Sequence, residues 1–166
     1  MLKWICIISL MSVLIAKDKW YDGNLKGIDE ISIAMNLKGV ENELWKNKIL
    51  TFVELGFSEA DLRLNKDAPM PKLIVDIYIV QSAANPISSY MISISIYNYT
   101  VSESEYFKSM ADSTITKKFM TNRIYEEEVV GQTSSETIYV EMEKVIIALI
   151  QQFMNQWYSD NPLSQF

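Results

Sequence analysis

Carboxylates are the side chains in this sequence best able to do acid–base chemistry. Asp76 lies between Val75 and Ile77 in the apolar run KLIVDIYIV. Buried carboxyl groups hold their proton to higher pH, so a buried Asp76 would be a candidate general acid. The alternative is that Asp76 faces a solvated side of a sheet and pairs with a Lys or Arg. If Asp76 is buried, it could act with one acid of the run 126–128 as the two carboxylates of a glycosidase-type hydrolase.

The run Glu126, Glu127 and Glu128 is a second acidic feature. With Asp112 it offers the oxygen ligands that a hard cation such as calcium prefers. Its spacing matches no calcium-binding loop, and such runs are typical of solvated strand ends. The sequence therefore predicts no metal site.

Tyrosines form a third group of candidates, at Tyr78, Tyr97, Tyr99 and Tyr125. On one face of a sheet they would make an aromatic platform for a sugar or a partner peptide. The alternative is ordinary packing within the sheet. We take these four residues as a possible interaction face.

Missing residue types exclude most catalytic chemistry. The chain has no histidine, its one cysteine is Cys6, and its five glycines are scattered singly. Serine–histidine and cysteine–histidine nucleophiles, zinc, haem and iron–sulfur sites, and glycine-rich phosphate loops are all unsupported. The sequence predicts a protein that is not an enzyme, with no catalytic residue and no cofactor.

Length and charge limit the class of protein. At 166 residues the chain has room for one domain with a sizeable core, and 49% of its residues are hydrophobic. Its net charge is -6. Because phosphate binding needs a basic face, we expect no nucleic-acid partner.

The first residues have the pattern of an export signal. Lys3 precedes the uncharged run from Trp4 to Ala16, which at ~13 residues is shorter than the roughly 20 that a spanning helix needs. We expect a signal peptide at 1–16, a flexible arm at 17–30 and a single domain at 31–162; an uncleaved N-terminal anchor is the alternative. The predicted location is the bacterial periplasm or the exterior, with no stable membrane span after cleavage.

Alternation of apolar residues predicts the strands of that domain. Residues 31–37, 73–80 and 89–100 alternate as strands, and 115–131 reads as a more polar edge strand protected by Lys117, Lys118 and Arg123. Residues 41–55 have a helical period, with Gly56 placed as a C-cap. Around Leu62 and Leu64 either another helical turn or a short strand is possible.

The C-terminal region predicts a long helix that closes the core. TSSE at 133–136 matches a capping box, with Thr133 as N-cap. Apolar residues then recur every three or four positions, at Ile138, Met142, Val145, Ile146, Leu149, Phe153 and Trp157. Charges and amides between them would be costly in a bilayer. The predicted fold is α+β: a mainly antiparallel sheet of three to four strands packed by two helices, the longer one C-terminal.

Two stretches carry a family resemblance. In ALIQQFMNQWYSDNP the matching features are Phe153, Trp157 or Tyr158, and the terminator Asn161-Pro162. With KILTFVEL and its acid Glu54, and with the order of elements, the chain resembles a diffuse group of uncharacterised small exported bacterial α+β proteins. It departs from the group at Leu55-Gly56, where a Leu-Arg pair is usual, and at 119–121, where a Thr-Trp is frequent. The resemblance implies a fold and supplies no catalytic residue.

These observations favour a non-enzymatic, exported protein-interaction or envelope-assembly module. Its partner would be another envelope protein, bound through the exposed face or edge of the sheet. Two alternatives stay open: a carboxylate-dependent hydrolase that uses Asp76, and a carrier of a small lipophilic ligand in the space between helix and sheet.

Overall fold

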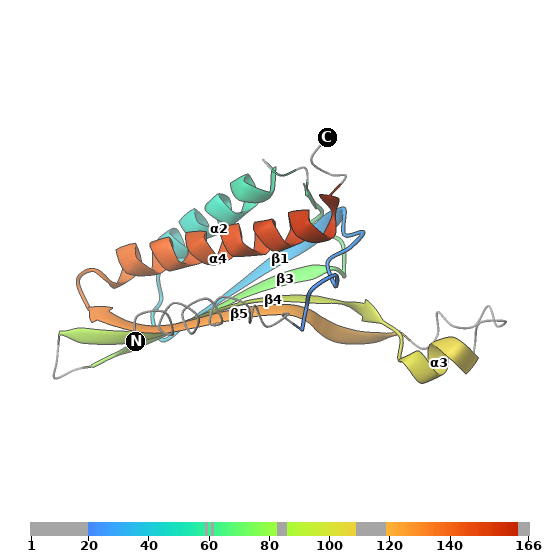
Figure 1. Ribbon diagram of the computed structural model, residues 1–166. Helices are drawn as coiled ribbons and strands as arrows, with labels where there is room; N and C mark the ends of the chain where they lie inside the picture. The colour runs from blue at the N-terminus through green and yellow to red at the C-terminus, as the bar shows by residue number, and fades with distance from the viewer. Residues whose placement is uncertain (1–19, 59, 61, 83–85, 109–118, 163–166) are drawn as a thin grey trace, which may run out of the picture.

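The fold has two layers, a β-sheet and a pair of helices. The computed structural model describes residues 20–58, 60, 62–82, 86–108 and 119–162. Helices α2 (Glu43–Ser58) and α4 (Ile138–Asp160) lie side by side on one face of the sheet, and the short α3 (Glu103–Lys108) lies beyond the end of β4 (Figure 1). The α+β class and the long C-terminal helix are confirmed. The expected signal peptide, Asp112, Lys117 and Lys118 lie outside the described residues.

The sheet is mixed and has five strands in the order β2-β1-β3-β4-β5. Their bounds are β1 Glu30–Lys38, β2 Arg63–Leu64, β3 Lys72–Gln81, β4 Ile87–Thr100 and β5 Met120–Ser134. Strands β3, β4 and β5 are antiparallel as expected, and β5 is at the edge. Strand β1 pairs in parallel with both β2 and β3. Parallel neighbours need a crossover, and α2 lies within the connection from β1 to β3.

The predicted capping box does not form. Thr133 pairs with Ser88, and Ser134 pairs with Ile87, in the ladder between β4 and β5. The helix begins at Ile138, and its N-cap Thr137 makes no capping hydrogen bond through its side chain. The strand ladder satisfies the backbone of 133–134, so these residues continue β5 instead of starting α4.

Helix α4 closes the hydrophobic core. It contacts β4, β5 and α2, and its buried side chains are Ile138, Met142, Ile146, Leu149, Ile150, Phe153, Met154 and Trp157. They pack against the apolar face of the sheet, to which β4 contributes Tyr90, Ile92, Ile94 and Ile96. None of the described helices is long and apolar enough to cross a membrane. The prediction that the C-terminal helix closes the core is therefore confirmed for α4.

The segment before β1 is docked against α4. Residues 20–28, which we call the strap, were expected to be part of a loose arm because their sequence has no period. Tyr21, Leu25 and Ile28 are buried in the core instead. The indole Nε1 of Trp157 donates to the carbonyl of Ile28 at 2.8 Å.

The C-terminal end of α4 fixes the backbone of the strap. The carboxylate of Asp160 accepts hydrogen bonds from the amides of Gly23 and Leu25, each at 3.0 Å. Asn161 accepts from the amide of Gly27 at 2.7 Å and donates to the carbonyl of Leu25 at 2.9 Å. These bonds run between chain segments that no local sequence pattern connects.

Replacing Phe153 by Ala should test whether α4 supplies the core. Phe153 is fully buried between Phe57 and Tyr125, so we expect a loss of about 3–5 kcal/mol in the free energy of unfolding. The control is Val140→Ala on the exposed side of the same helix, which should change stability by less than about 0.5 kcal/mol. Urea denaturation measures both. Equal effects of the two substitutions would contradict this role for α4.

Replacing Asp160 by Ala should release the strap. The partly exposed carboxylate loses its hydrogen bonds from the two strap amides and from the side chain of Gln156, and we expect destabilisation of about 1–2 kcal/mol. Amide hydrogen exchange at Gly23 and Leu25 should accelerate. The neighbouring exposed Ser159→Ala is the control. Unchanged exchange at those two amides in the Asp160 variant would show that other contacts hold the strap.

Candidate functional site

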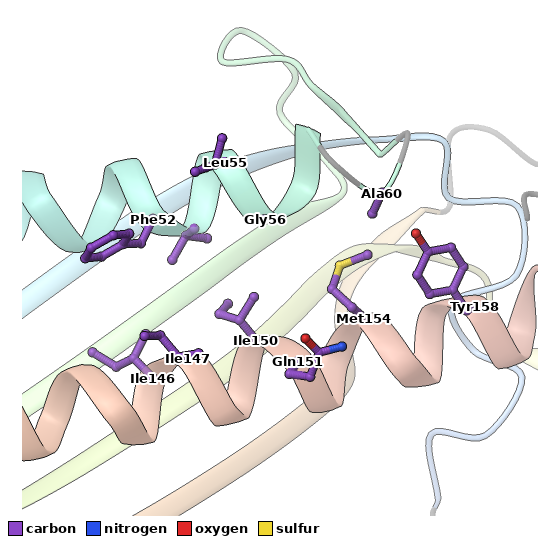
Figure 2. Close-up of a pocket in the computed structure, with 11 residues that line it drawn as sticks. Phe52, Leu55, Gly56, Ala60, Ile146, Ile147, Ile150, Gln151, Met154 and Tyr158 are labelled. Carbon is purple, nitrogen blue, oxygen red and sulfur yellow. The ribbon is translucent and has the colours of Figure 1, made fainter.

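An apolar groove lies between the two long helices (Figure 2). Its volume is about 440 Å³, and it is lined by residues between 52 and 56 of α2 and by residues between 146 and 158 of α4. The lining residues are Phe52, Val53, Leu55, Gly56, Ala60, Ile146, Ile147, Ile150, Gln151, Met154 and Tyr158. The groove opens away from the sheet, on the side of the helical layer that an amphipathic helix normally fills with polar residues.

The groove has a buried floor and exposed apolar rims. Val53, Ile146 and Ile150 form part of the core. By contrast, Phe52 is 42% exposed, and Leu55 and Ile147 are more than half exposed, at 56% and 55%. Contiguous apolar exposure of this kind marks binding surfaces on soluble proteins.

Gly56 widens the groove. The sequence predicted that this glycine ends α2, but the helix continues through it to Ser58. Continuing the helix buries Phe57, which packs on Phe153 with ring centres 5.5 Å apart, and this burial offsets the roughly 1 kcal/mol that glycine costs inside a helix. A Cβ at position 56 would lie 3.7 Å from the Cγ2 of Ile150, an ordinary contact. The absent side chain therefore leaves space, and larger residues there would fill it.

Polar contacts close the N-terminal side of the groove. Glu143 accepts from the Nε1 of Trp45 at 3.0 Å and pairs with Lys48 at 2.7 Å. The ammonium of Lys48 lies 5.6 Å from the ring centre of Phe52. These contacts join α2 to α4, so the spacing of the helices is held by specific bonds.

The lining itself carries no charge. Its polar side chains are Gln151, whose amide donates to Asn155 at 3.2 Å, and Tyr158. Such a lining suits a neutral apolar group with at most one or two hydrogen-bonding atoms. Sequence reasoning missed this site, because it followed only the core stripe of each helix. The available signal was apolar residues outside the core stripe, at Phe52 and Leu55 on α2 and at Ile147 on α4.

Asp76 lies on the face of the sheet opposite the groove. Its carboxylate accepts from the side-chain amide of Asn36 at 2.8 Å. Across the strands Asp76 pairs with Ser93, and Ser93 pairs with Glu128, which puts the two acids about 10 Å apart at two strand spacings. Both side chains lie on the open face of the sheet and point toward solvent. Neither acid therefore lines a concave site.

The strand alternation divides the acidic run between the two faces. Glu126 lies on the open face and pairs with Arg123. Glu127 points to the helix face, where it accepts from Tyr21 and, at 2.6 Å, from the side-chain amide of Gln152. Within the described ranges, no group of three or more acidic, histidine or cysteine side chains could hold a metal ion.

Three of the four tyrosines share the open face, and the fourth does not. Tyr78 accepts from Lys38 at 3.3 Å, and Tyr99 stacks on Phe119 with ring centres 6.0 Å apart, while Tyr97 pairs across the strands with Lys72. Tyr125 must be removed from the proposed platform, because strand alternation turns it into the core.

The hydroxyl of Tyr125 is buried without a partner. Its ring lies 4.5 Å from that of Tyr21 and 5.4 Å from that of Phe153, centre to centre. Among the described residues, no hydrogen-bonding group reaches its oxygen. Burial raises the pKa of Tyr125 far above its ordinary value of 10.0, and the negative charges of Glu127 and ionised Tyr21 add to the shift.

Comparisons with known proteins identify a distant structural neighbour. No protein-family model and no curated protein matches the sequence. Among solved structures, the chain is similar to a minor lipoprotein from Acinetobacter baumannii, with a TM-score of 0.39 and 10% sequence identity. The match covers 82% of this chain and 95% of that one.

The buried hydroxyl predicts a measurable pH dependence. Above pH 10 the unfolded chain releases the Tyr125 proton and the folded chain keeps it, so the folded state binds more protons and stability falls as pH rises. Tyr125 should contribute a loss of about 1.4 kcal/mol per pH unit there. Tyr125→Phe should remove this contribution and cost little at pH 7, because no hydrogen bond is lost. Denaturation of both proteins at pH 8 to 11 measures the difference; parallel profiles would contradict the assignment.

Proposed function

We propose that this protein is a non-enzymatic binding module of the bacterial envelope, and that the α2–α4 groove receives an apolar helical segment of a partner protein. The observation that carries the proposal is the uncharged groove with exposed apolar rims at Phe52, Leu55 and Ile147. Envelope location follows from the export pattern of residues 1–16 and belongs to the same proposal.

The dimensions of the groove support a helical occupant. From Ile146 to Tyr158 the α4 wall rises about 18 Å, which is a little more than three turns. A helix laid along such a groove places side chains at positions i, i+4, i+7 and i+11 against it. The parallel rims of α2 and α4 would contact both sides of that apolar stripe.

The chemistry of the lining supports binding without catalysis. An amide and a phenol are the polar side chains that Gln151 and Tyr158 present, and neither is a nucleophile with an adjacent base. The acids that the sequence offered for hydrolysis, Asp76 and Glu128, lie on the other face of the sheet. The groove is therefore better suited to hold an apolar surface than to transform a substrate.

A small lipophilic molecule is the second candidate occupant. A volume of about 440 Å³ is within the range of small-molecule sites, which extends over about 300–1,000 Å³. Gln151 and Tyr158 would then orient a neutral polar head. This site lies between the helices and not between helix and sheet, where the sequence had suggested a carrier cavity.

A matched pair of positions on α4 tests the groove. A photo-crosslinking amino acid at Ile147 should capture one envelope protein in cells, and the same amino acid at Val140 should not, although the two residues are equally exposed. The crosslinked peptide should be an apolar helical segment. A synthetic copy of that segment should bind the purified protein, and Ile147→Glu should weaken binding at least about tenfold, while Val140→Glu should not. Equal loss in both variants would overturn the groove as the site.

Filling the groove distinguishes the two occupants. Gly56→Leu should keep the fold, since its Cβ makes an ordinary contact, and should reduce the binding of any occupant. Displacement of the fluorescent apolar probe N-phenyl-naphthylamine then separates the cases. A partner peptide that displaces the probe supports the protein proposal. Displacement by palmitate or phospholipid, with no protein captured at Ile147, would replace it by the carrier function.

A further inference from the structure

We infer that the outer edge of β5 accepts an extended basic segment of a partner protein as a sixth strand of the sheet. The segment concerned is 126–134, the second part of β5, which lies on the sheet and not in the groove. The inference therefore stands independently of the function proposed for α2 and α4. It depends on three observations: the position of β5, the lack of protection along this stretch, and the placement of its charges.

Strand β5 ends the sheet and is long. It has 15 residues, and along the described part of the chain no strand pairs with its outer side. Its inner side is paired with β4 as far as Ile87 and Ser134, so the ladder with β4 continues to the end of the strand. At the other end, Asn24 of the strap donates to the carbonyl of Ile124 at 3.1 Å and closes the edge there. The open stretch therefore begins at Glu126.

The usual protection of edge strands is missing from the second half of β5. Proteins shield edges with lysines, prolines or bulges. Here the register shift opposite Ile96 and Tyr97 lies at the end that Asn24 already closes. Residues 129–134, with the sequence VVGQTS, contain neither charge nor proline, and Val130 is 69% exposed. This stretch offers unpaired backbone groups to an incoming strand.

Charge complementarity selects a basic partner. Glu126 and Glu128 point to the open face two positions apart, so they would face alternate residues of an added strand. Glu126 already pairs with Arg123, whereas Glu128 is exposed and has no partner within the described ranges. Lys or Arg directly opposite an acid stabilises a strand pair, and a second acid destabilises it. The chain's net charge of -6 also attracts a cationic segment.

A second copy of this chain fits the edge less well. Antiparallel self-pairing centred on Val130 would place Glu128 opposite Gln132 and Glu126 opposite Ser134. Glu128 would then remain without a cation, while two negatively charged chains approach each other. A basic segment from another protein supplies a cation to the acid and is attracted to the negatively charged chain, so we assign the edge to such a segment.

Three nine-residue peptides test the inference. One has lysine at two alternate positions among valine and threonine, the second has glutamate at those positions, and the third is the lysine peptide with alternate backbone nitrogens methylated. Fluorescence anisotropy should show binding of the lysine peptide at least about fivefold tighter than the glutamate peptide. Methylation should abolish binding, because it removes the donors of the ladder. Amide exchange at residues 129–134 should slow when the lysine peptide is added.

Charge variants locate the binding site. Glu128→Lys should reverse the preference between the lysine and glutamate peptides. Asp67→Lys makes the same charge change on an exposed residue beside β2, at the opposite edge of the sheet, and should leave the preference unchanged. Ile147→Glu in the groove should also leave it unchanged, so failure of the groove proposal and failure of this one are distinguishable.

Three outcomes would overturn the inference. Undiminished binding of the methylated peptide would exclude strand addition. Equal effects of the Glu128 and Asp67 substitutions would reduce the binding to general electrostatics. Protection of amides 129–134 without peptide, together with a dimer in analytical ultracentrifugation, would assign the edge to a second copy.

Discussion

The packing of α4 on the sheet is the interaction on which the rest of the structure depends. Its buried stripe, with Phe153 and Trp157 at the C-terminal half, covers the apolar faces of β4 and β5. Phe57 of α2 packs on Phe153, and the indole of Trp157 holds the carbonyl of Ile28. Helix α2, the strap and the sheet thus all pack on α4. With Cys6 as its one cysteine the chain cannot form an internal disulfide, so the fold depends on hydrophobic burial, to which this helix contributes eight side chains.

A two-layer fold leaves surfaces that a third layer would cover. The helices shield one face of the sheet, but their own outer side retains the groove with its apolar rims at Leu55 and Ile147. The sheet closes at the β2 side with a strand of two residues, and at the β5 side it ends in a long, unpaired strand. Apolar surface is unfavourable in water, and the unpaired backbone groups of a sheet edge can form a ladder with another strand. The two binding surfaces proposed for this protein are those where the architecture leaves such groups exposed.

Side-chain periodicity predicted the elements more reliably than residue type predicted a site. Strands β1, β3, β4 and β5 and the long helix follow from alternation and from the helical repeat, because these patterns reflect which face is buried. The tyrosines were grouped by type, and alternation then separated Tyr125 from Tyr78, Tyr97 and Tyr99. The motif TSSE does not cap α4, because its first residues pair with β4. Gly56 stays within α2 because the burial of Phe57 outweighs the tendency of glycine to end a helix. In each case a tertiary contact of greater energy overrode a local signal.

The sequence by itself determined that this is an α+β domain with no histidine and one cysteine, whose last helix is amphipathic and closes a core. Those properties depend on composition and on short-range period, which are local. Only the tertiary structure decided that β1 lies parallel to β3, that the strap is fixed by Asp160 and Asn161, and that α2 and α4 leave a groove between them. These features join segments up to 137 positions apart, and no local pattern records such distant contacts.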